Sequence, residues 1–167
     1  MEYFDLCSVD RKPLGKKVQR GTRLNSNEYH LVVMAIIINE NREVLLTKRS
    51  KNKIAGGLWE CTAGSVLAGE NSRDAIIREV KEEIGININV SEYPIAGYSE
   101  GDALFDFWIV KIDNKIQDLI LQTEEVDEAK YVTLNEIQNI ISNGIATKSL
   151  NELIKLNMNG LISIKDK

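Results

Sequence analysis

The longest apolar run in the chain is Leu31 to Ile38, which contains no polar position and is rich in β-branched residues. Such a run is typical of a strand that is covered on both faces of a sheet. Val44 to Thr47 follows after a turn-like Asn39-Glu40-Asn41 and is predicted to be its partner strand. A sheet is therefore predicted to begin here. Further strands are expected at Leu58–Val66, with a break at Gly64, and at Tyr93–Ser99, Leu104–Ile112 and Ala129–Val132.

Helical periodicity appears first between Asn71 and Ile84, where apolar residues recur every four positions. Asn71 or Ser72 is suited to cap the start of this helix, and Gly85 accepts the left-handed turn that follows a last helical residue. Two further helices are predicted at Leu134–Ser142 and Ser149–Met158. Strands and helices interleaved in this order predict an α/β fold, with a mixed sheet and helices on its faces.

The first 28 residues are predicted to form a peripheral hairpin. Tyr3 to Val9 and Leu14 to Leu24 flank a turn-like Asp10-Arg11-Lys12-Pro13. Between Arg11 and Arg23 there are six basic residues and no acidic one. The segment either meets a polyphosphate substrate, with Arg23 as a candidate binding residue, or forms a solvated basic edge that prevents association between sheets.

Composition places the chain among ordinary globular proteins. Its 167 residues are 43% hydrophobic and 28% charged, which predicts one domain over residues 1–167. The net charge of -4 argues against a nucleic-acid binder, and the longest apolar run is too short for a membrane helix. Cys7 and Cys61 lie far apart without a metal-binding spacing, and are expected to be free thiols in a reducing cytoplasm.

Candidate chemistry concentrates on the helix from Asn71 to Ile84. Glu79, Glu82 and Glu83 stand within one turn of each other, so the helix is expected to aim their carboxylates at one point. Like charges so placed repel, and a divalent cation would neutralise them, with Mg²⁺ preferring carboxylates together with substrate phosphates. A solvated acidic face is the alternative. Arg78 is placed to pair with Asp74, with Glu82 or with Glu70 of the preceding loop.

The spacing around these acids carries a family resemblance. Gly64 is followed after five residues by Glu70, after seven more by Arg78-Glu79-Val80, and then by Glu82-Glu83 and Gly85-Ile86. This segment, residues 64–86, resembles the signature of the Nudix hydrolases at every fixed position. The similarity extends roughly from Leu31 to Ile141.

The resemblance implies a Nudix fold, an α/β/α sandwich, and hydrolysis of a diphosphate compound, usually a nucleoside derivative, with Mg²⁺ or Mn²⁺. It implies that Glu79, Glu82 and Glu83 bind metal or serve catalysis, and that the main-chain carbonyl of Ala63 completes the coordination. Arg78 is carried over as a further catalytic candidate. A further carboxylate is expected from Glu124 or Glu125 in the loop before Tyr131, and Glu125 is taken as the candidate. Gly64, Glu70 and Gly85 are the structural positions of the box. The resemblance also implies a small-molecule substrate, and a homodimer is common in the family.

Two other readings stay open from the sequence. The scaffold is similar to the isopentenyl-diphosphate isomerase branch of the same fold, but Ala63 and Ser65 stand where that branch has a catalytic Cys and a His, and Cys61 is displaced by two residues. His30, the one His of the sequence, matches a metal-binding histidine of that branch, and a structural role at the start of a strand is the alternative for it. A nucleotide-sensing domain without catalysis is the other reading. Trp59 is expected either to stack on a substrate base or to fill the core, and Arg49 is a further candidate for substrate binding.

Overall fold

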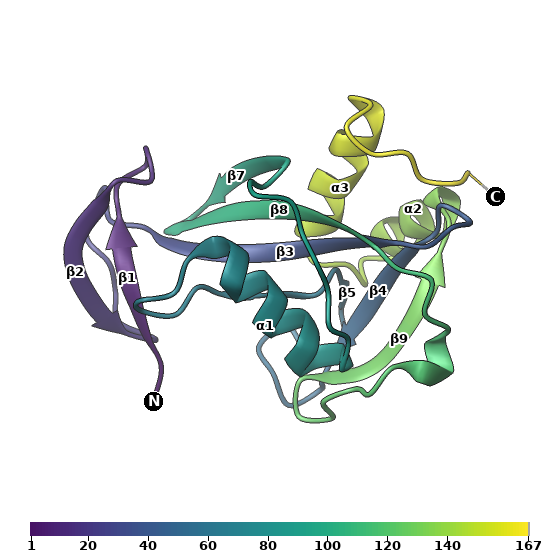
Figure 1. Cartoon of the computed structure of the whole chain (residues 1–167), viewed down its shortest axis with the longest axis horizontal. Helices are drawn as coiled ribbons and strands as arrows, with labels where there is room; N and C mark the ends of the chain where they lie inside the picture. Colours follow the sequence, from purple (N-terminus) through teal and green to yellow (C-terminus); the bar gives the residue numbers. More distant parts are fainter. Residues whose placement is uncertain (167) are drawn as a thin grey trace.

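The main sheet is built around strand β3 (His30–Ile38) in the computed structural model, which describes residues 1–166 (Figure 1). The strands lie in the order β5-β4-β3-β8-β7, while β6 pairs with β3 and β9 pairs with β4. The bounds of these strands are β4 (Val44–Arg49), β5 (Trp59–Glu60), β6 (Ala63–Ser65), β7 (Ala96–Glu100), β8 (Ala103–Lys111) and β9 (Val126–Val132).

The sheet is mixed, as the sequence predicts. β3 and β8 run parallel, in register from His30 opposite Ala103 to Ile38 opposite Lys111. The other pairs are antiparallel, and β4 keeps only one paired position with β3 while it follows β9 along its length. β4 therefore diverges from β3, and β6 takes its place beside the first half of β3.

Alternate residues of β3 supply two hydrophobic cores on opposite faces of the sheet. Met34, Ile36 and Ile38 belong to one core, whereas Val33 and Ile37 belong to the other. This double burial explains why the strand has no polar position, because a strand with helices on both faces has no solvated side.

Helices cover both faces. The helix α1 (Ser72–Ile84) packs on one face, and α2 (Leu134–Ser142) and α3 (Ser149–Met158) lie on the other (Figure 1). The short 3-10 helix η1 (Ile116–Asp118) precedes β9. All three α-helices begin and end where the sequence predicts them, and the α/β/α sandwich is confirmed.

The strand expected over Leu58–Val66 is interrupted at Cys61-Thr62 and not at Gly64, where the sequence predicts its break. The segment forms two short strands, β5 and β6, because the chain changes partners within it. Glu60 pairs with Thr47 of β4, whereas Ala63 pairs with Met34 of β3. Cys61 and Thr62 cross the gap where β3 and β4 diverge, and they leave the strand pattern to do so.

The N-terminal segment forms a separate two-stranded sheet of β1 (Tyr3–Cys7) and β2 (Pro13–Gln19), at one end of the molecule (Figure 1). Its second strand ends five residues earlier than the sequence suggests. Thr22 donates a backbone hydrogen bond to Gln19 at 3.0 Å, and Gly21 between them has a φ of +90°. This turn ends the strand.

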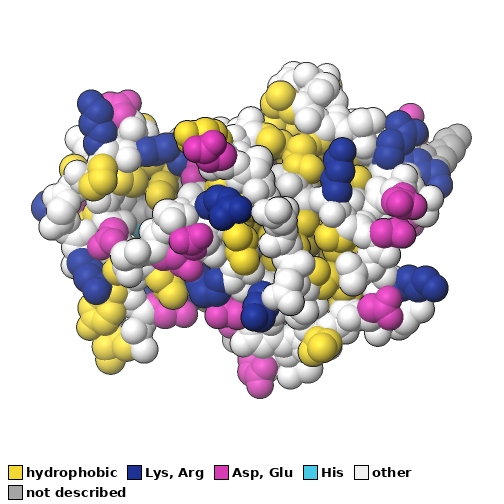
Figure 2. All heavy atoms as spheres, in the orientation of Figure 1, with side chains coloured by type: hydrophobic (Ala, Val, Ile, Leu, Met, Phe, Trp, Pro, Cys, Tyr) yellow, Lys and Arg dark blue, Asp and Glu magenta, His cyan; other side chains and the backbone are white. Residues whose placement is uncertain are grey.

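Charged side chains of both signs are interspersed over the face in Figure 2, with hydrophobic side chains between them. Within residues 1–166, no helix combines the length and the apolar character that crossing a bilayer requires.

Candidate active site

The helix α1 is fixed at both ends and along its buried face, which makes it a rigid support for the acidic residues. The Asn71 side chain accepts a hydrogen bond from the Asp74 N–H at 2.9 Å. Gly85 follows the helix with a φ of +76°, and its N–H donates to the Lys81 carbonyl. The apolar face, which includes Ile76 and Val80, is fully buried against the sheet.

Arg78 organises the first half of the site. Its Nε and Nη2 each donate to one oxygen of Glu70, both at 2.9 Å, and Nη2 also donates to the Ser65 carbonyl at 3.0 Å. Burial alone would raise the pKa of Glu70, but the hydrogen bonds from Arg78 and from the Leu67 N–H outweigh it and hold that pKa low. The two-point pair ties the loop before α1 to the helix, and of the three partners proposed from sequence only Asp74 is not used.

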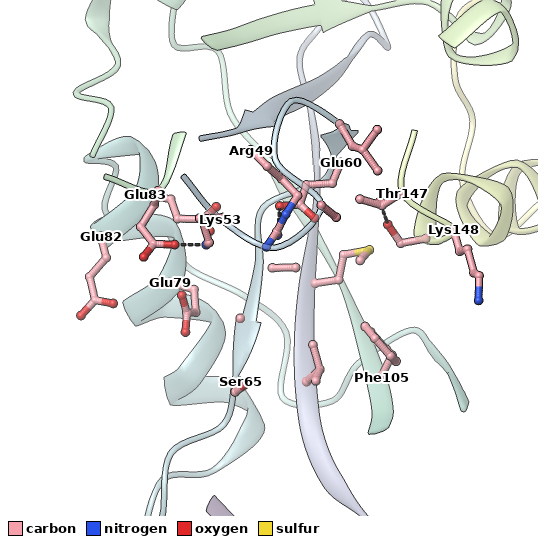
Figure 3. A pocket seen from close by; sticks show the side chains of 18 of the residues that line it. Arg49, Lys53, Glu60, Ser65, Glu79, Glu82, Glu83, Phe105, Thr147 and Lys148 are labelled. Atoms are coloured by element: carbon pink, nitrogen blue, oxygen red, sulfur yellow. Dashed lines mark hydrogen bonds and ion pairs between the residues drawn. The ribbon is translucent and has the colours of Figure 1, made fainter. Parts of the chain in front are cut away.

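Arg78 also controls where the helix acids point. Its Nη1 donates to Glu79 at 2.7 Å and to Glu82 at 3.0 Å. Glu82 lies on the outer side of the helix with its side chain 52% exposed, whereas Glu79 and Glu83 lie nearer the strands (Figure 3). Within the described residues, no three ligand side chains lie close enough to hold a metal ion together. Arg78 contacts Glu79 and Glu82 here, and a common metal site for all three carboxylates stays a prediction.

Glu79 lies in a notch that only glycine leaves open. A Cβ built on Gly64 would lie 1.9 Å from Glu79 Cδ and 2.1 Å from its Oε1. Burial raises the pKa of Glu79, and the neighbouring Arg78 opposes that rise. The glycine at this position of the box therefore has a direct steric reason, which is the close approach of the Glu79 carboxylate to β6.

Glu83 is the most buried of the three acids, with only 4% of the residue exposed. Its Oε2 has no hydrogen-bond partner. Burial, followed by the charges of Glu60 and Glu79, raises the pKa of Glu83 to about 8. A buried carboxylate oxygen without a partner is costly, and a divalent cation would satisfy it. Glu79 and Glu83 therefore fit such an ion, and Ala63 lines the same cavity.

Cations face these acids across the site. Arg49 donates to Glu60 at 2.5 Å and to the Ile54 carbonyl at 3.0 Å, and Lys53 pairs with Glu125. Burial, and then the charge of Arg49, lower the pKa of Lys53. Both residues predicted from sequence, Arg49 and Glu125, line the cavity. Lys53 is a site residue that sequence reasoning missed, since a loop lysine carries no periodicity or motif.

The cavity has a volume of about 550 Å³ and extends from α1 to the segment before α3 (Figure 3). Its far end is lined by Phe105, Tyr98 and Thr147. The rings of Tyr98 and Phe105 stack with centroids 4.5 Å apart, and the buried Tyr98 hydroxyl has no hydrogen-bond partner. Thr147 Oγ1 and Ser149 Oγ lie 2.7 Å apart and share one hydrogen bond. This end is apolar in its walls and offers hydroxyl groups at its edge.

Trp59 holds the far end in place but does not reach the cavity. The backbone N–H of Trp59 donates to the Ile145 carbonyl at 2.8 Å, and the backbone carbonyl of Trp59 accepts from the Thr147 N–H at 2.9 Å. The residue is 5% exposed, packs in the core, and is covered by the ammonium groups of Lys130 and Lys48, at 4.2 and 5.6 Å from the ring centroid. Of the two roles that the sequence leaves open for Trp59, its position corresponds to the core role.

The predicted basic contact also changes residue. Arg23 is exposed and lies outside the cavity, while Arg20 of the same segment lines it together with Glu2. Arg20 and Arg23 are two of the six basic residues in this segment, and the sequence contains no signal that shows which of the six lines the cavity.

The residues needed for the isomerase reading do not meet in this site. Cys61 is fully buried, and burial raises the pKa of its thiol to about 12, which is unfavourable for a reactive thiolate. His30 stacks on Phe4 with ring centroids 5.2 Å apart and does not line the cavity.

Comparison with known proteins agrees with this geometry. A family model described as NUDIX domain matches residues 28–152. An uncharacterized Nudix hydrolase of Listeria monocytogenes is 38% identical over 161 residues, which cover 93% of this chain and 95% of that protein. The CTP pyrophosphohydrolase of Escherichia coli is 41% identical over 61 residues, covering 36% of this chain and 45% of that protein. The crystal structure of DR0079 from Deinococcus radiodurans superimposes with a TM-score of 0.78 at 20% identity, over 92% of this chain and 98% of that one.

Proposed function

Because the chain belongs to the Nudix hydrolase family, which acts on pyrophosphate bonds of nucleotide derivatives, we propose that it hydrolyses the diphosphate linkage of a nucleoside diphosphate derivative with Mg²⁺ or Mn²⁺. The observation that carries the proposal is the unpartnered oxygen of Glu83, buried beside Glu79 at one end of the cavity. A binding site for a neutral molecule would gain nothing from a buried carboxylate in this position.

Glu79, Glu82 and Glu83 of α1 would hold the cation. When bound, the cation neutralises the diphosphate and polarises the attacking water. Arg78 keeps the Glu79 carboxylate oriented through a 2.7 Å hydrogen bond. Glu125 is the candidate for the general base, since it lines the cavity from a loop separate from α1 and accepts a hydrogen bond from Lys53.

The two ends of the cavity indicate how the substrate lies. Its diphosphate is placed at the α1 end, where Arg49 and Lys53 offset the negative charge. Its other half is placed against Tyr98 and Phe105, whose stacked rings offer an apolar wall. A nucleobase is flat and has hydrogen-bonding edges, which suits this wall and the nearby hydroxyl of Thr147.

The test is a hydrolysis screen of nucleoside diphosphate sugars, dinucleoside polyphosphates, nucleoside triphosphates and isoprenoid diphosphates. Enzyme dialysed against EDTA should be inactive, and Mg²⁺ or Mn²⁺ should restore turnover. The Glu83→Gln variant should stay inactive at every metal concentration. Turnover that excess EDTA leaves unchanged would show that the metal role of these carboxylates is wrong.

A further inference from the structure

The N-terminal hairpin reaches the cavity although it lies outside the residues that the family model matches. Glu2 and Arg20, at the paired ends of β1 and β2, line the same cavity as Glu79 and Glu83. We infer that Arg20 binds a phosphate group of the substrate. In the absence of substrate the Arg20 guanidinium is paired with the Glu2 carboxylate, and the phosphate displaces Glu2 from this pair. This inference rests on the proposed function for the identity of the ligand as a diphosphate compound.

The hairpin is docked where such a contact is useful. The Ala68 N–H donates to the Tyr3 carbonyl at 2.8 Å, and the Gly69 N–H donates to Asp5 Oδ2 at 2.7 Å. Both bonds attach β1 to the loop that leads into α1 (Figure 1). The Arg20 N–H donates to the Glu2 carbonyl at 3.0 Å, which fixes the backbone of Arg20 against the start of β1.

The ion pair of Arg20 differs from the other pairs that line the cavity near α1. Arg49 and Glu60 have side chains that are 19% and 10% exposed, and the Arg78 side chain is 24% exposed. The Arg20 and Glu2 side chains are 62% and 48% exposed, and their atoms lie 2.6 Å apart. Exposed pairs of this kind are weak, because water screens both charges. Arg20 therefore changes partner more easily than Arg49 and Arg78 do.

A substrate phosphate is a better partner for this guanidinium than Glu2 is. A phosphate carries more charge than one carboxylate and accepts two parallel hydrogen bonds from the planar fork of an arginine. Glu2 would then act as a competitor built into the chain, which keeps the guanidinium in place between turnovers and lowers the apparent affinity for substrate.

Two substitutions separate this role from a structural one. Arg20→Gln and Glu2→Gln break the same ion pair, so a purely structural role would move the affinity in the same direction in both variants. The inference requires opposite directions. Arg20→Gln should raise KM about tenfold, the effect of losing a charge-assisted contact, and Glu2→Gln should lower KM about twofold to fivefold, with kcat nearly unchanged in both.

The experiment combines steady-state kinetics on the best substrate with calorimetric titration of inorganic pyrophosphate in the presence of Mg²⁺. Lys12→Gln is the matched control, since it removes one positive charge from the exposed turn of the same hairpin, outside the cavity. Pyrophosphate should bind about tenfold more weakly to Arg20→Gln, more tightly to Glu2→Gln, and unchanged to the control.

The two claims fail in different ways. If no diphosphate compound is hydrolysed but pyrophosphate affinity follows Arg20 as stated, the proposed function fails and the phosphate contact stands. If the substrate is hydrolysed and both variants shift KM and pyrophosphate affinity in the same direction, or in neither, the contact is wrong and the function stands. Failure of pyrophosphate to bind the unmodified protein also overturns the contact.

Discussion

The replacement of Gly64 by Ala tests the geometry of the acidic notch directly. Gly64 has no left-handed φ, so an Ala there meets no backbone strain, and the effect comes from the new methyl group alone. That group would lie 1.9 Å from Glu79 Cδ, whereas ordinary contact begins at 3.4 Å, so the carboxylate must retreat by about 1.5 Å. Backbone and strand pairing need not change for this to happen.

The expected effect on stability is small and the effect on activity is large. The obstacle is the end of a flexible side chain, so we expect a loss of about 1 kcal/mol, at the low end for overpacking, as Glu79 is pushed off its 2.7 Å bond with Arg78. A misplacement of about 1 Å costs roughly a hundredfold in rate when it affects a group in the reaction. The kcat should therefore fall by about a hundredfold, while KM changes little.

A double-variant cycle identifies the cause. Urea unfolding is measured for the unmodified protein, Gly64→Ala, Glu79→Ala and the double variant, with kcat for the first two. In the Glu79→Ala background the methyl group meets no carboxylate, so the cost of Gly64→Ala should vanish, which gives a coupling of about 1 kcal/mol. An equal cost in both backgrounds, or a Gly64→Ala enzyme that retains its kcat, would refute the steric argument.

Three further predictions concern the box and its surroundings. Glu82→Gln should lower kcat at least about a hundredfold. It should leave the free energy of unfolding in urea within about 0.5 kcal/mol of the unmodified protein, because the Glu82 side chain is 52% exposed. Glu152→Gln, outside the cavity, is the control, and equal kcat values in the two variants would contradict the role of Glu82. Gly85→Ala should lower the free energy of unfolding by about 1 to 3 kcal/mol, because Gly85 has a φ of +76° and a Cβ there would lie 2.7 Å from Ile120 Cβ. Thermal unfolding measures this loss, and an unchanged Tm would refute it. Backbone and side-chain hydrogen bonds at the start of α2 lower the pKa of Glu136. This group therefore adds stability that is present above its unfolded pKa and is lost as the pH falls through the lower folded value. Glu136→Gln should flatten this loss of stability in acid, measured by urea unfolding as a function of pH, and identical pH profiles for the two proteins would contradict the argument.

Most of the correct predictions of helices and strands rest on interactions between residues that are close together in the sequence. The run from Leu31 to Ile38 is apolar at every position because both faces of β3 are covered, and this is visible without a structure. The ends of α1 follow from Asn71 and Gly85, whose side-chain acceptor and left-handed backbone act within a few residues. Such signals survive in the sequence because their physical causes are local.

The missed features depend on contacts between distant segments. Trp59 is buried because lysines from two other strands, Lys48 and Lys130, cover its ring, and no window around Trp59 contains that information. Arg20 reaches the cavity because the hairpin docks on the loop at Gly69, through a bond to Asp5. Tertiary placement decides which of several equivalent side chains is used.

The parallel pairing of β3 with β8 has a consequence for the nascent chain during synthesis. β3 ends at Ile38, and its parallel neighbour begins only at Ala103, so the most apolar strand of the protein is synthesised long before it can be paired along its whole length. At about 5 to 20 residues per second, a delay of this length lasts roughly 3 to 13 s, during which an apolar strand edge is open to other chains. The helix α1 is synthesised during this interval, and in the folded protein it packs on one face of β3. It is therefore the first helix of the chain that becomes available to cover a face of this strand.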